Sequence, residues 1–360
     1  MAIPDLLASA IERGASDVHL SAGLPPLIRV DGDIEPLVSE PVHACELSAW
    51  IEDVATDRDR QDFAECHEAD FSLAVPALGR FRVNVFESRR GPGAVFRTVP
   101  ESVPTLQDLD LGPTFQQIAQ APRGLVLVTG PTGSGKSTTL AAMIDYVNKT
   151  RRGHILTIED PIEFVHEPRK SLVNQREVGR DTSTLSGALR AALREDPDVI
   201  LIGELRDLES IRLALTAAET GHLVFASLHT PSAPKAVDRI LAVFPAGEKE
   251  TIRSILSESL HAVIWQTLLK REGASSGQSG GGGTGRRIAA HEILVATPAV
   301  RNLIREQKIA QIYSAMQTSS ASGMETLDQC LQRLVANGSV SVETARANAR
   351  FPNAIRGAGP

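Results

Sequence analysis

Residues 130–137 have the composition and spacing of a phosphate-binding loop, Gly-Pro-Thr-Gly-Ser-Gly-Lys-Ser. Its glycines let the backbone curl so that successive N–H groups point inward at phosphate oxygens. Lys136 adds a positive charge at the β- and γ-phosphates, and the Ser137 hydroxyl can bind Mg²⁺. The motif predicts a site for a nucleotide with Mg²⁺ that is formed by Gly130, Pro131, Thr132, Gly133, Ser134, Gly135, Lys136, Ser137 and Thr138. The loop alone does not separate ATPases from GTPases, kinases and helicases.

Carboxylates follow two apolar segments farther along the chain, one residue in the first place and a group of three in the second. Glu204 follows the apolar run 199–202 after one glycine. Ligands of open α/β sheets bind at the carboxyl ends of the strands, so Glu204 could order the Mg²⁺ shell or polarise an attacking water. The second group follows the run 155–158 and consists of Glu159, Asp160 and Glu163. Carboxylates this close repel one another unless a cation or arginine compensates, which favours a place at the nucleotide site.

Histidines and arginines supply further candidates. His222 and His229 bracket the apolar segment 223–228, so we expect them at opposite ends of one strand rather than as a chelating pair. His229, at the carboxyl end, could sense the γ-phosphate. No cysteine or third histidine stands at ligand spacing, which disfavours a zinc site. Three arginines on predicted strands near the N-terminus either face solvent or reach a nucleotide bound on another domain or subunit: Arg80, Arg82 and Arg97.

These residues require an α/β framework. Apolar strands alternate with helices from residue 124 onward, which predicts a parallel sheet with both faces covered. The predicted strands are 125–129, 155–158, 199–202 and 223–228, and the predicted helices are 137–149, 185–194 and 208–219. The first hundred residues predict a separate small α/β domain with short strands around one helical stretch, 46–63.

The remaining segments complete a predicted division into an N-terminal domain (1–100), a linker (101–122), a nucleotide-binding core (123–297) and a helical C-terminal region (298–360). Three prolines and a short helix after Pro113 suggest the linker. Within the core we expect a long helix at 248–269 and a strand at 288–295. Between them, 273–285 is mostly glycine and serine, which is typical of a flexible surface insertion.

Composition narrows the possible functions. The 360 residues carry a formal charge of −7, which argues against binding of a nucleic-acid backbone as the main role. The three cysteines form no Cys-x-x-Cys pair, as suits a reducing compartment. We detect neither a signal peptide nor an apolar run long enough to span a membrane. A cytoplasmic protein with at most peripheral membrane contact is expected.

Five stretches together resemble one family, the type II/IV secretion ATPases, and most nearly its type IV pilus retraction (twitching-motility) branch. They are Gly-Ala-Ser-Asp-Val-His-Leu (14–20), Gly-Pro-Thr-Gly-Ser-Gly-Lys-Ser-Thr-Thr-Leu (130–140), Ile-Leu-Thr-Ile-Glu-Asp-Pro-Ile-Glu-Phe-Val-His (155–166), Leu-Arg-Glu-Asp-Pro-Asp-Val-Ile-Leu-Ile-Gly-Glu-Leu-Arg-Asp (193–207) and Glu-Thr-Gly-His-Leu-Val-Phe-Ala-Ser-Leu-His-Thr (219–230). The resemblance covers nearly the whole chain apart from 273–285 and about the last ten residues.

The resemblance implies a PAS-like N-terminal domain joined to a RecA-like ATPase domain, assembled as a homohexameric ring. It assigns Lys136 and Ser137 to ATP and Mg²⁺, and Glu204 to the Walker B box. It leaves open whether Glu163 of the Asp box or Glu204 is the general base, and it makes His222 and His229 the His-box pair. The implied partners are the pilus machinery and its inner-membrane platform protein, at the cytoplasmic face of that membrane.

Segment 299–306, Ala-Val-Arg-Asn-Leu-Ile-Arg-Glu, is similar to a C-terminal motif associated with retraction, with Val300 where isoleucine is usual. As a helix it would have an apolar stripe and a displayed polar side, the latter consisting of Arg301, Arg305 and Glu306. The alternatives are an accessory retraction paralogue or a type II secretion ATPase. Readings from other classes are a RecA-like nucleic-acid translocase, which the acidic balance and the lack of a basic stripe disfavour, and a phosphotransferase.

Overall fold

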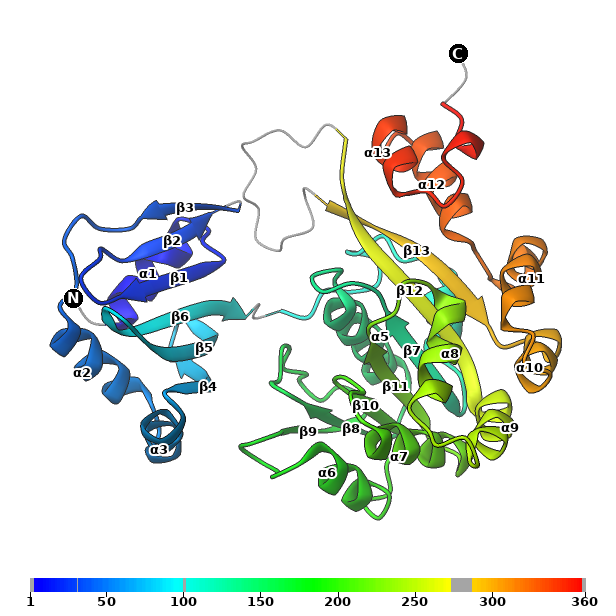
Figure 1. Cartoon of the computed structure of the whole chain (residues 1–360), viewed down its shortest axis with the longest axis horizontal. Helices are drawn as coiled ribbons and strands as arrows, with labels where there is room; N and C mark the ends of the chain where they lie inside the picture. The colour runs from blue at the N-terminus through cyan, green and yellow to red at the C-terminus, as the bar shows by residue number, and fades with distance from the viewer. Residues whose placement is uncertain (1–2, 31, 100–101, 273–286, 358–360) are drawn as a thin grey trace. The chain divides into compact units, whose positions relative to one another are not determined.

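The computed structural model describes residues 3–30, 32–99, 102–272 and 287–357. The chain divides into two compact units, residues 1–102 and 103–360, which are described separately (Figure 1). The predicted glycine- and serine-rich insertion, 273–285, lies outside the described residues. No helix in the described ranges combines the length and hydropathy of a membrane-spanning segment.

The first unit contains an antiparallel sheet with the strand order β3-β2-β1-β6-β5-β4. Its strands are β1 (Asp17–Ser21), β2 (Leu27–Val30), β3 (Asp33–Pro36), β4 (Glu68–Val75), β5 (Gly79–Ser88) and β6 (Gly91–Val99). Its helices are α1 (Ile3–Glu12), α2 (Ala44–Val54) and α3 (Asp57–Cys66). Along β5 burial alternates, with Phe81, Val83 and Val85 in the core, so the intervening Arg82 points to the opposite face of the sheet.

The predicted helical stretch 46–63 is helical but divided, because α2 ends at Val54 and α3 begins at Asp57. Thr56 is the N-cap of α3. Its hydroxyl accepts from the Asp59 N–H at 3.3 Å, and Asp59 Oδ2 accepts from the Thr56 N–H at 2.9 Å. This reciprocal capping box satisfies two backbone donors that a new helix would otherwise leave unpaired. The Thr-x-x-Asp spacing therefore interrupts an otherwise helical pattern.

The second unit contains a sheet with the strand order β13-β12-β7-β11-β10-β8-β9, parallel except for the β12–β13 hairpin. Its strands are β7 (Gly124–Thr129), β8 (His154–Glu159), β9 (Leu172–Glu177), β10 (Val199–Ile202), β11 (Leu223–Leu228), β12 (Leu260–Lys270) and β13 (Arg287–Val295). The helices that cover it are α4 (Pro113–Ala119), α5 (Lys136–Thr150), α6 (Leu185–Ala192), α7 (Leu208–Glu219), α8 (Ala233–Ala242) and α9 (Lys249–Ser259). The predicted α/β fold with a parallel core is confirmed.

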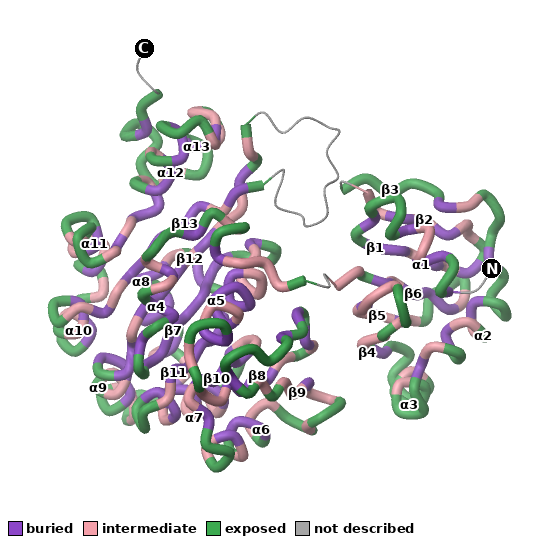
Figure 2. Tube along the Cα trace, turned by 180° about the vertical axis from the view of Figure 1, so that it is seen from behind, coloured by how far each residue is buried: buried purple, intermediate pink, exposed green. Residues whose placement is uncertain are grey.

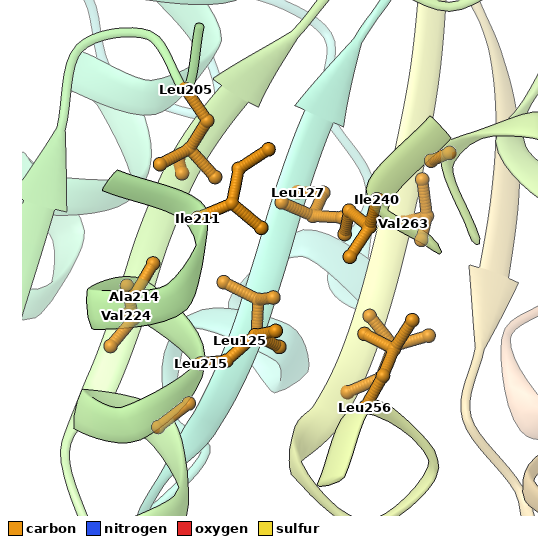
Figure 3. Packing of buried hydrophobic residues seen from close by; sticks show 14 of the residues in the cluster. Leu125, Leu127, Leu205, Ile211, Ala214, Leu215, Val224, Ile240, Leu256 and Val263 are labelled. Atoms are coloured by element: carbon orange, nitrogen blue, oxygen red, sulfur yellow. The ribbon is translucent and has the colours of Figure 1, made fainter. Parts of the chain in front are cut away.

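Strand β7 is buried on both faces, as Figure 2 shows for the centre of this unit. Leu125 and Leu127 pack in the cluster formed with α7, α8 and α9 (Figure 3), whereas Val126 and Val128 pack in the cluster formed with α4 and α5. Alternate side chains of β7 therefore pack against helices on opposite faces of the sheet. This packing holds the start of the phosphate-binding loop, directly after Thr129, in a fixed place.

The predicted linker 101–122 is largely part of the second unit. Leu106, Leu111, Phe115 and Ile118 are all at most 6% exposed and belong to the apolar cluster that contains β7 and α5. Pro113, one of the prolines that suggested a linker, instead starts a short helix, α4, whose apolar face packs on α5. Burial of these side chains ties the segment to the nucleotide-binding sheet.

The predicted long helix 248–269 is also wrong. The helix α9 ends at Ser259, and the chain continues as the strand β12 between β7 and β13. Val263, Ile264, Trp265 and Thr267 are β-branched or aromatic, which suits a strand better than a helix. Pairing with a strand on each side satisfies the backbone groups of β12, and that long-range pairing decides against the local helical pattern.

The C-terminal region is helical, as predicted. Its described residues, 298–357, form α10 (Pro298–Arg305), α11 (Ile312–Thr318), α12 (Leu327–Ala336), α13 (Val342–Asn348) and three short 3₁₀ helices, Ile309–Gln311, Ser320–Ser322 and Pro352–Ala354. Val300 and Ile304 of α10 are fully buried, as the predicted apolar stripe requires. The polar side is only partly displayed, because Arg301 donates to the backbone carbonyls of Ala296 (2.9 Å), Ser257 (2.7 Å) and Glu258.

Candidate nucleotide-binding and catalytic site

The phosphate-binding loop joins β7 to α5 in the predicted strand–loop–helix context. Gly130, Gly133 and Gly135 have φ angles of 138°, 75° and 84°, which residues other than glycine rarely adopt. At Gly130 an added Cβ would also lie 2.2 Å from the backbone oxygen of Gln266 on β12. These glycines therefore permit both the curl of the loop and its close approach to the neighbouring strand.

Lys136 begins α5 and turns back over the loop. Its Nζ donates to the carbonyl oxygens of Pro131 at 3.0 Å and Gly130 at 3.3 Å. Burial lowers the pKa of the Lys136 ammonium group, whereas the nearby negative charges of Glu204 and Glu163 act in the opposite direction. Carboxylates from the two predicted acidic boxes therefore lie within electrostatic reach of the loop lysine.

Glu204 lies just beyond the carboxyl end of β10, in the middle of a charged cluster. Its Oε1 is 3.1 Å from Nε2 of His229, which follows β11. Arg206 donates to the other oxygen, Oε2, from Nε at 3.0 Å and from Nη2 at 2.9 Å. The same guanidinium group lies 3.8 Å from Asp160 Oδ2, beyond the end of β8. Three strands that are adjacent in the sheet thus bring the Walker B, His and Asp boxes together.

Backbone contacts hold Glu204 in place. The Gly203 N–H donates to the Ile158 carbonyl at 2.9 Å, and the Leu205 N–H donates to the Ser227 carbonyl at 3.0 Å. The hydroxyl of Ser227 donates to the Gly203 carbonyl at 2.5 Å. The turn that carries Glu204 is therefore fixed from both neighbouring strands, which limits the movement of its carboxylate.

The carboxylates of the Asp box differ in environment. Glu159 is partly buried, and its Oε1 accepts from Thr157 Oγ1 at 2.7 Å and from Gln175 Nε2 at 3.3 Å. Burial raises the pKa of Glu159 to about 7, although these hydrogen bonds favour the ionised form. Asp160 and Glu163 are exposed. Of the acids in this box, Glu163 and Asp160 are therefore open to solvent, whereas Glu159 makes contacts at the strand end.

We expect Glu159→Gln to change the pH dependence of stability. A folded-state pKa raised above the unfolded value means that the folded protein binds more protons between about pH 4.5 and 7, so stability falls as pH rises through this window. Glutamine mimics the protonated acid and keeps the acceptor oxygen. The difference in melting temperature between variant and wild type should therefore be more favourable to the variant at pH 8 than at pH 5.

The control for this titration is Glu167→Gln, an exposed position on the loop that follows β8. Its melting temperature should follow that of the wild type at both pH values. A Glu159→Gln variant whose melting temperature runs parallel to the wild-type curve from pH 5 to 8 would contradict a raised pKa at Glu159.

His222 lies apart from this cluster, and the three arginines belong to the other unit. His222 is at the amino end of β11, where its Nδ1 lies 2.9 Å from the Ala217 carbonyl at the end of α7. This position, at the opposite end of the strand from His229, indicates a structural contact. Arg80, Arg82 and Arg97 belong to the first unit. Arg82 and Arg97 are cross-strand neighbours, and Arg97 Nε donates to the buried carboxylate of Asp17 at 2.7 Å.

The donor groups at the loop fit a Mg²⁺ ion that accompanies a nucleotide. The Ser137 hydroxyl and the Glu204 carboxylate are hard oxygen donors of the kind that Mg²⁺ prefers. Across the described part of the chain, no group of three or more His, Cys, Asp or Glu side chains could hold a metal ion. Mg²⁺ at nucleotide sites commonly takes its remaining ligands from phosphate oxygens and water.

Sequence reasoning missed two residues that contact this site. Arg206 bridges Glu204 and Asp160, and its position two residues after the Walker B glutamate is a usable signal. Gln266 contacts the phosphate-binding loop from β12, and no signal in the sequence connects it to the loop, because its segment was predicted to be helical.

Known proteins are similar to this chain over nearly its full length. The family of type II/IV secretion system proteins matches residues 2–347. The chain is 60% identical over 352 residues to the Pseudomonas aeruginosa protein named "Type IV pilus retractation ATPase PilT", with 98% of this chain and 99% of that protein covered. It is 40% identical over 356 residues to the type IV pilus ATPase PilU of the same organism, with 99% and 91% covered.

A solved structure is similar over almost the whole chain. The crystal structure of the pilus retraction motor PilT with bound ADP matches with a TM-score of 0.89 at 44% sequence identity and covers 98% of both chains. This agreement extends to both units of the fold and includes the sheet that carries the loop. The chain belongs to the family of type II/IV secretion system proteins.

Proposed function

We propose that this protein is an ATP-hydrolysing motor that powers type IV pilus retraction. The observation that carries the proposal is 60% identity to a pilus retraction ATPase over nearly the full length of both proteins. The site supports it, because a phosphate-binding loop, a fixed glutamate and a histidine meet at one edge of the sheet. The similarity to a motor that binds ADP supports ATP with Mg²⁺ as the ligand.

In this proposal side chains of the second unit bind and hydrolyse the nucleotide, and two arginines of the first unit assist. Lys136 and the loop N–H groups hold the phosphates, and Ser137 binds Mg²⁺, which neutralises phosphate charge when bound. Glu204 orients or deprotonates the attacking water, with Glu163 as the alternative base, while His229 and Arg206 set the orientation of the Glu204 carboxylate. Arg82 and Arg97 stabilise transition-state charge, in the same chain or in a neighbouring one.

The wider setting is also part of the proposal. The motor acts as a homohexamer in the cytoplasm, at the face of the inner membrane, and contacts that membrane only through the pilus platform protein. The nearest alternatives are an accessory retraction motor, given 40% identity to PilU, and a type II secretion ATPase.

Deletion of the gene in its own organism tests the proposal. Loss of twitching with retention of surface pili, restored by the wild-type gene, is the expected result. Normal twitching with impaired protein secretion would favour the secretion alternative. Normal twitching in the single deletion, with a defect only under increased load on the pili, would favour the accessory motor.

Variants of the two arginines of α10 should distinguish a role of this helix in stability from a role in pilus retraction. Arg301→Ala should lower the melting temperature, because carbonyls at the end of α9 lose their donor, at a cost of roughly 1–3 kcal/mol. Arg305 is exposed and makes an ion pair with Glu258 at 2.7 Å, and an exposed pair contributes only ~0–1 kcal/mol. We therefore expect Arg305→Ala combined with Glu306→Ala to spare stability and ATP hydrolysis but to impair twitching.

Melting curves, ATPase rates and twitching zones of the single and double variants provide the measurement. Normal twitching in the Arg305→Ala, Glu306→Ala variant would remove α10 from the output path. A melting temperature for Arg301→Ala equal to that of the wild type would show that its hydrogen bonds to α9 are not stabilising.

A further inference from the structure

Gln266 on β12 links that strand to the phosphate-binding loop. Its side chain is buried, with 1% of its surface exposed. Nε2 donates to the Ser134 carbonyl within the loop at 2.6 Å, and Oε1 accepts from the hydroxyl of Thr139 on α5 at 2.9 Å. One amide group therefore joins the loop to the helix that follows it, from a strand more than a hundred residues later in the chain.

The contact fixes the direction of one peptide group. In a planar trans peptide the C=O and the following N–H point in opposite directions. Because the Ser134 carbonyl is turned toward Gln266, the Gly135 N–H must point away from β12, into the curl of the loop. This is the orientation in which a loop N–H can donate to a phosphate oxygen.

The orientation of the Gln266 amide is itself determined. If its oxygen and nitrogen were exchanged, two acceptors, Oε1 and the Ser134 oxygen, would face each other at 2.6 Å. Thr139 donates to the oxygen and leaves the NH₂ group for Ser134. Because all of these atoms are buried, loss of either partner would leave polar groups unsatisfied.

The surrounding contacts leave Gln266 little freedom to move. A Cβ added at Gly135 would lie 3.3 Å from Gln266 Nε2, so the amide packs directly against the loop. On the other side, Gln266 pairs in register with His291 of β13. The His291 ring stacks edge-on against Phe115 of α4, with 5.0 Å between ring centroids. Pairing of β12 with β13, together with the contact of His291 with Phe115, thus keeps Gln266 beside the phosphate-binding loop.

We propose that Gln266 is a positioning residue for the phosphate-binding loop, holding the Ser134–Gly135 peptide with its N–H toward the phosphates. The inference rests on the proposed ATP binding and extends it to a residue outside the Walker A, Asp, Walker B and His boxes. In this proposal Gln266 contacts the loop rather than the nucleotide. It acts through the loop backbone.

The test is the dissociation constant for ADP of Gln266→Leu, measured by calorimetry on protein shown to be folded. Leucine fills a similar volume but cannot donate to Ser134, so we expect affinity to fall roughly 10- to 100-fold. Val263→Ala is the matched control: Val263 is buried on the opposite face of β12, away from the loop. It should lower the melting temperature without changing the affinity for ADP.

Thr139 provides a second, milder test that serves if Gln266→Leu does not fold. Thr139→Val removes the hydroxyl at constant shape and should weaken ADP binding, whereas Thr139→Ser keeps the hydroxyl and should bind more tightly than Thr139→Val. A Gln266→Leu protein with wild-type affinity, or equal affinities for the two Thr139 variants, would overturn the inference. Failure of the wild-type protein to bind ADP would instead contradict the proposed function.

Discussion

Lys136→Ala is expected to reduce ATP turnover by about 100- to 1,000-fold, and to weaken nucleotide binding, without unfolding the protein. Lys136 places its charge on the loop and makes its only described hydrogen bonds to two loop carbonyls. Its removal therefore takes away phosphate stabilisation but little packing. The measurement is the steady-state ATPase rate together with the melting temperature.

Lys149→Ala is the control for this experiment. Lys149 lies in the last turn of the same helix, where it pairs with Asp145 at 2.7 Å and remains 46% exposed. The variant removes an equal charge from α5 and should leave turnover unchanged. An ATPase rate for Lys136→Ala near that of Lys149→Ala would refute the assignment of the loop.

Glu204→Gln is expected to retain ATP binding while hydrolysis falls about 100- to 10,000-fold. Glutamine keeps an oxygen that can accept from Arg206, so the cluster that contains His229 and Asp160 should survive. It cannot act as a base and is a weak ligand for the Mg²⁺ shell. The measurement pairs single-turnover hydrolysis with equilibrium binding of ATP.

Comparison with Glu163→Gln distinguishes the two candidate bases. Both carboxylates act on Lys136, but only Glu204 has its carboxylate held by a histidine and an arginine. We therefore expect the larger loss in Glu204→Gln. A greater loss in Glu163→Gln would transfer the role of base to the Asp box, and weakened ATP binding with normal hydrolysis in Glu204→Gln would contradict its catalytic role.

The sequence alone was sufficient for the local parts of the site. The predicted bounds 199–202, 208–219 and 223–228 are those of β10, α7 and β11 in the structure. Burial on both faces makes such strands continuously apolar, and the helix has its own cap at Asp207, so the signals lie within each segment. The phosphate-binding loop could also be predicted from sequence, because its glycines and Lys136 lie within one short segment.

Only the tertiary structure decided the contacts between distant segments. Residues 260–269 follow a helical segment without a turn signal and were predicted as its continuation, but they form a strand because β7 and β13 pair with them from both sides. Gln266 could not be connected to Ser134, nor Arg206 to Asp160, until the strand order was known. The burial that raises the pKa of Glu159 also comes from packing. Hydrogen-bond pairing and desolvation depend on neighbours in space, which a single sequence does not specify.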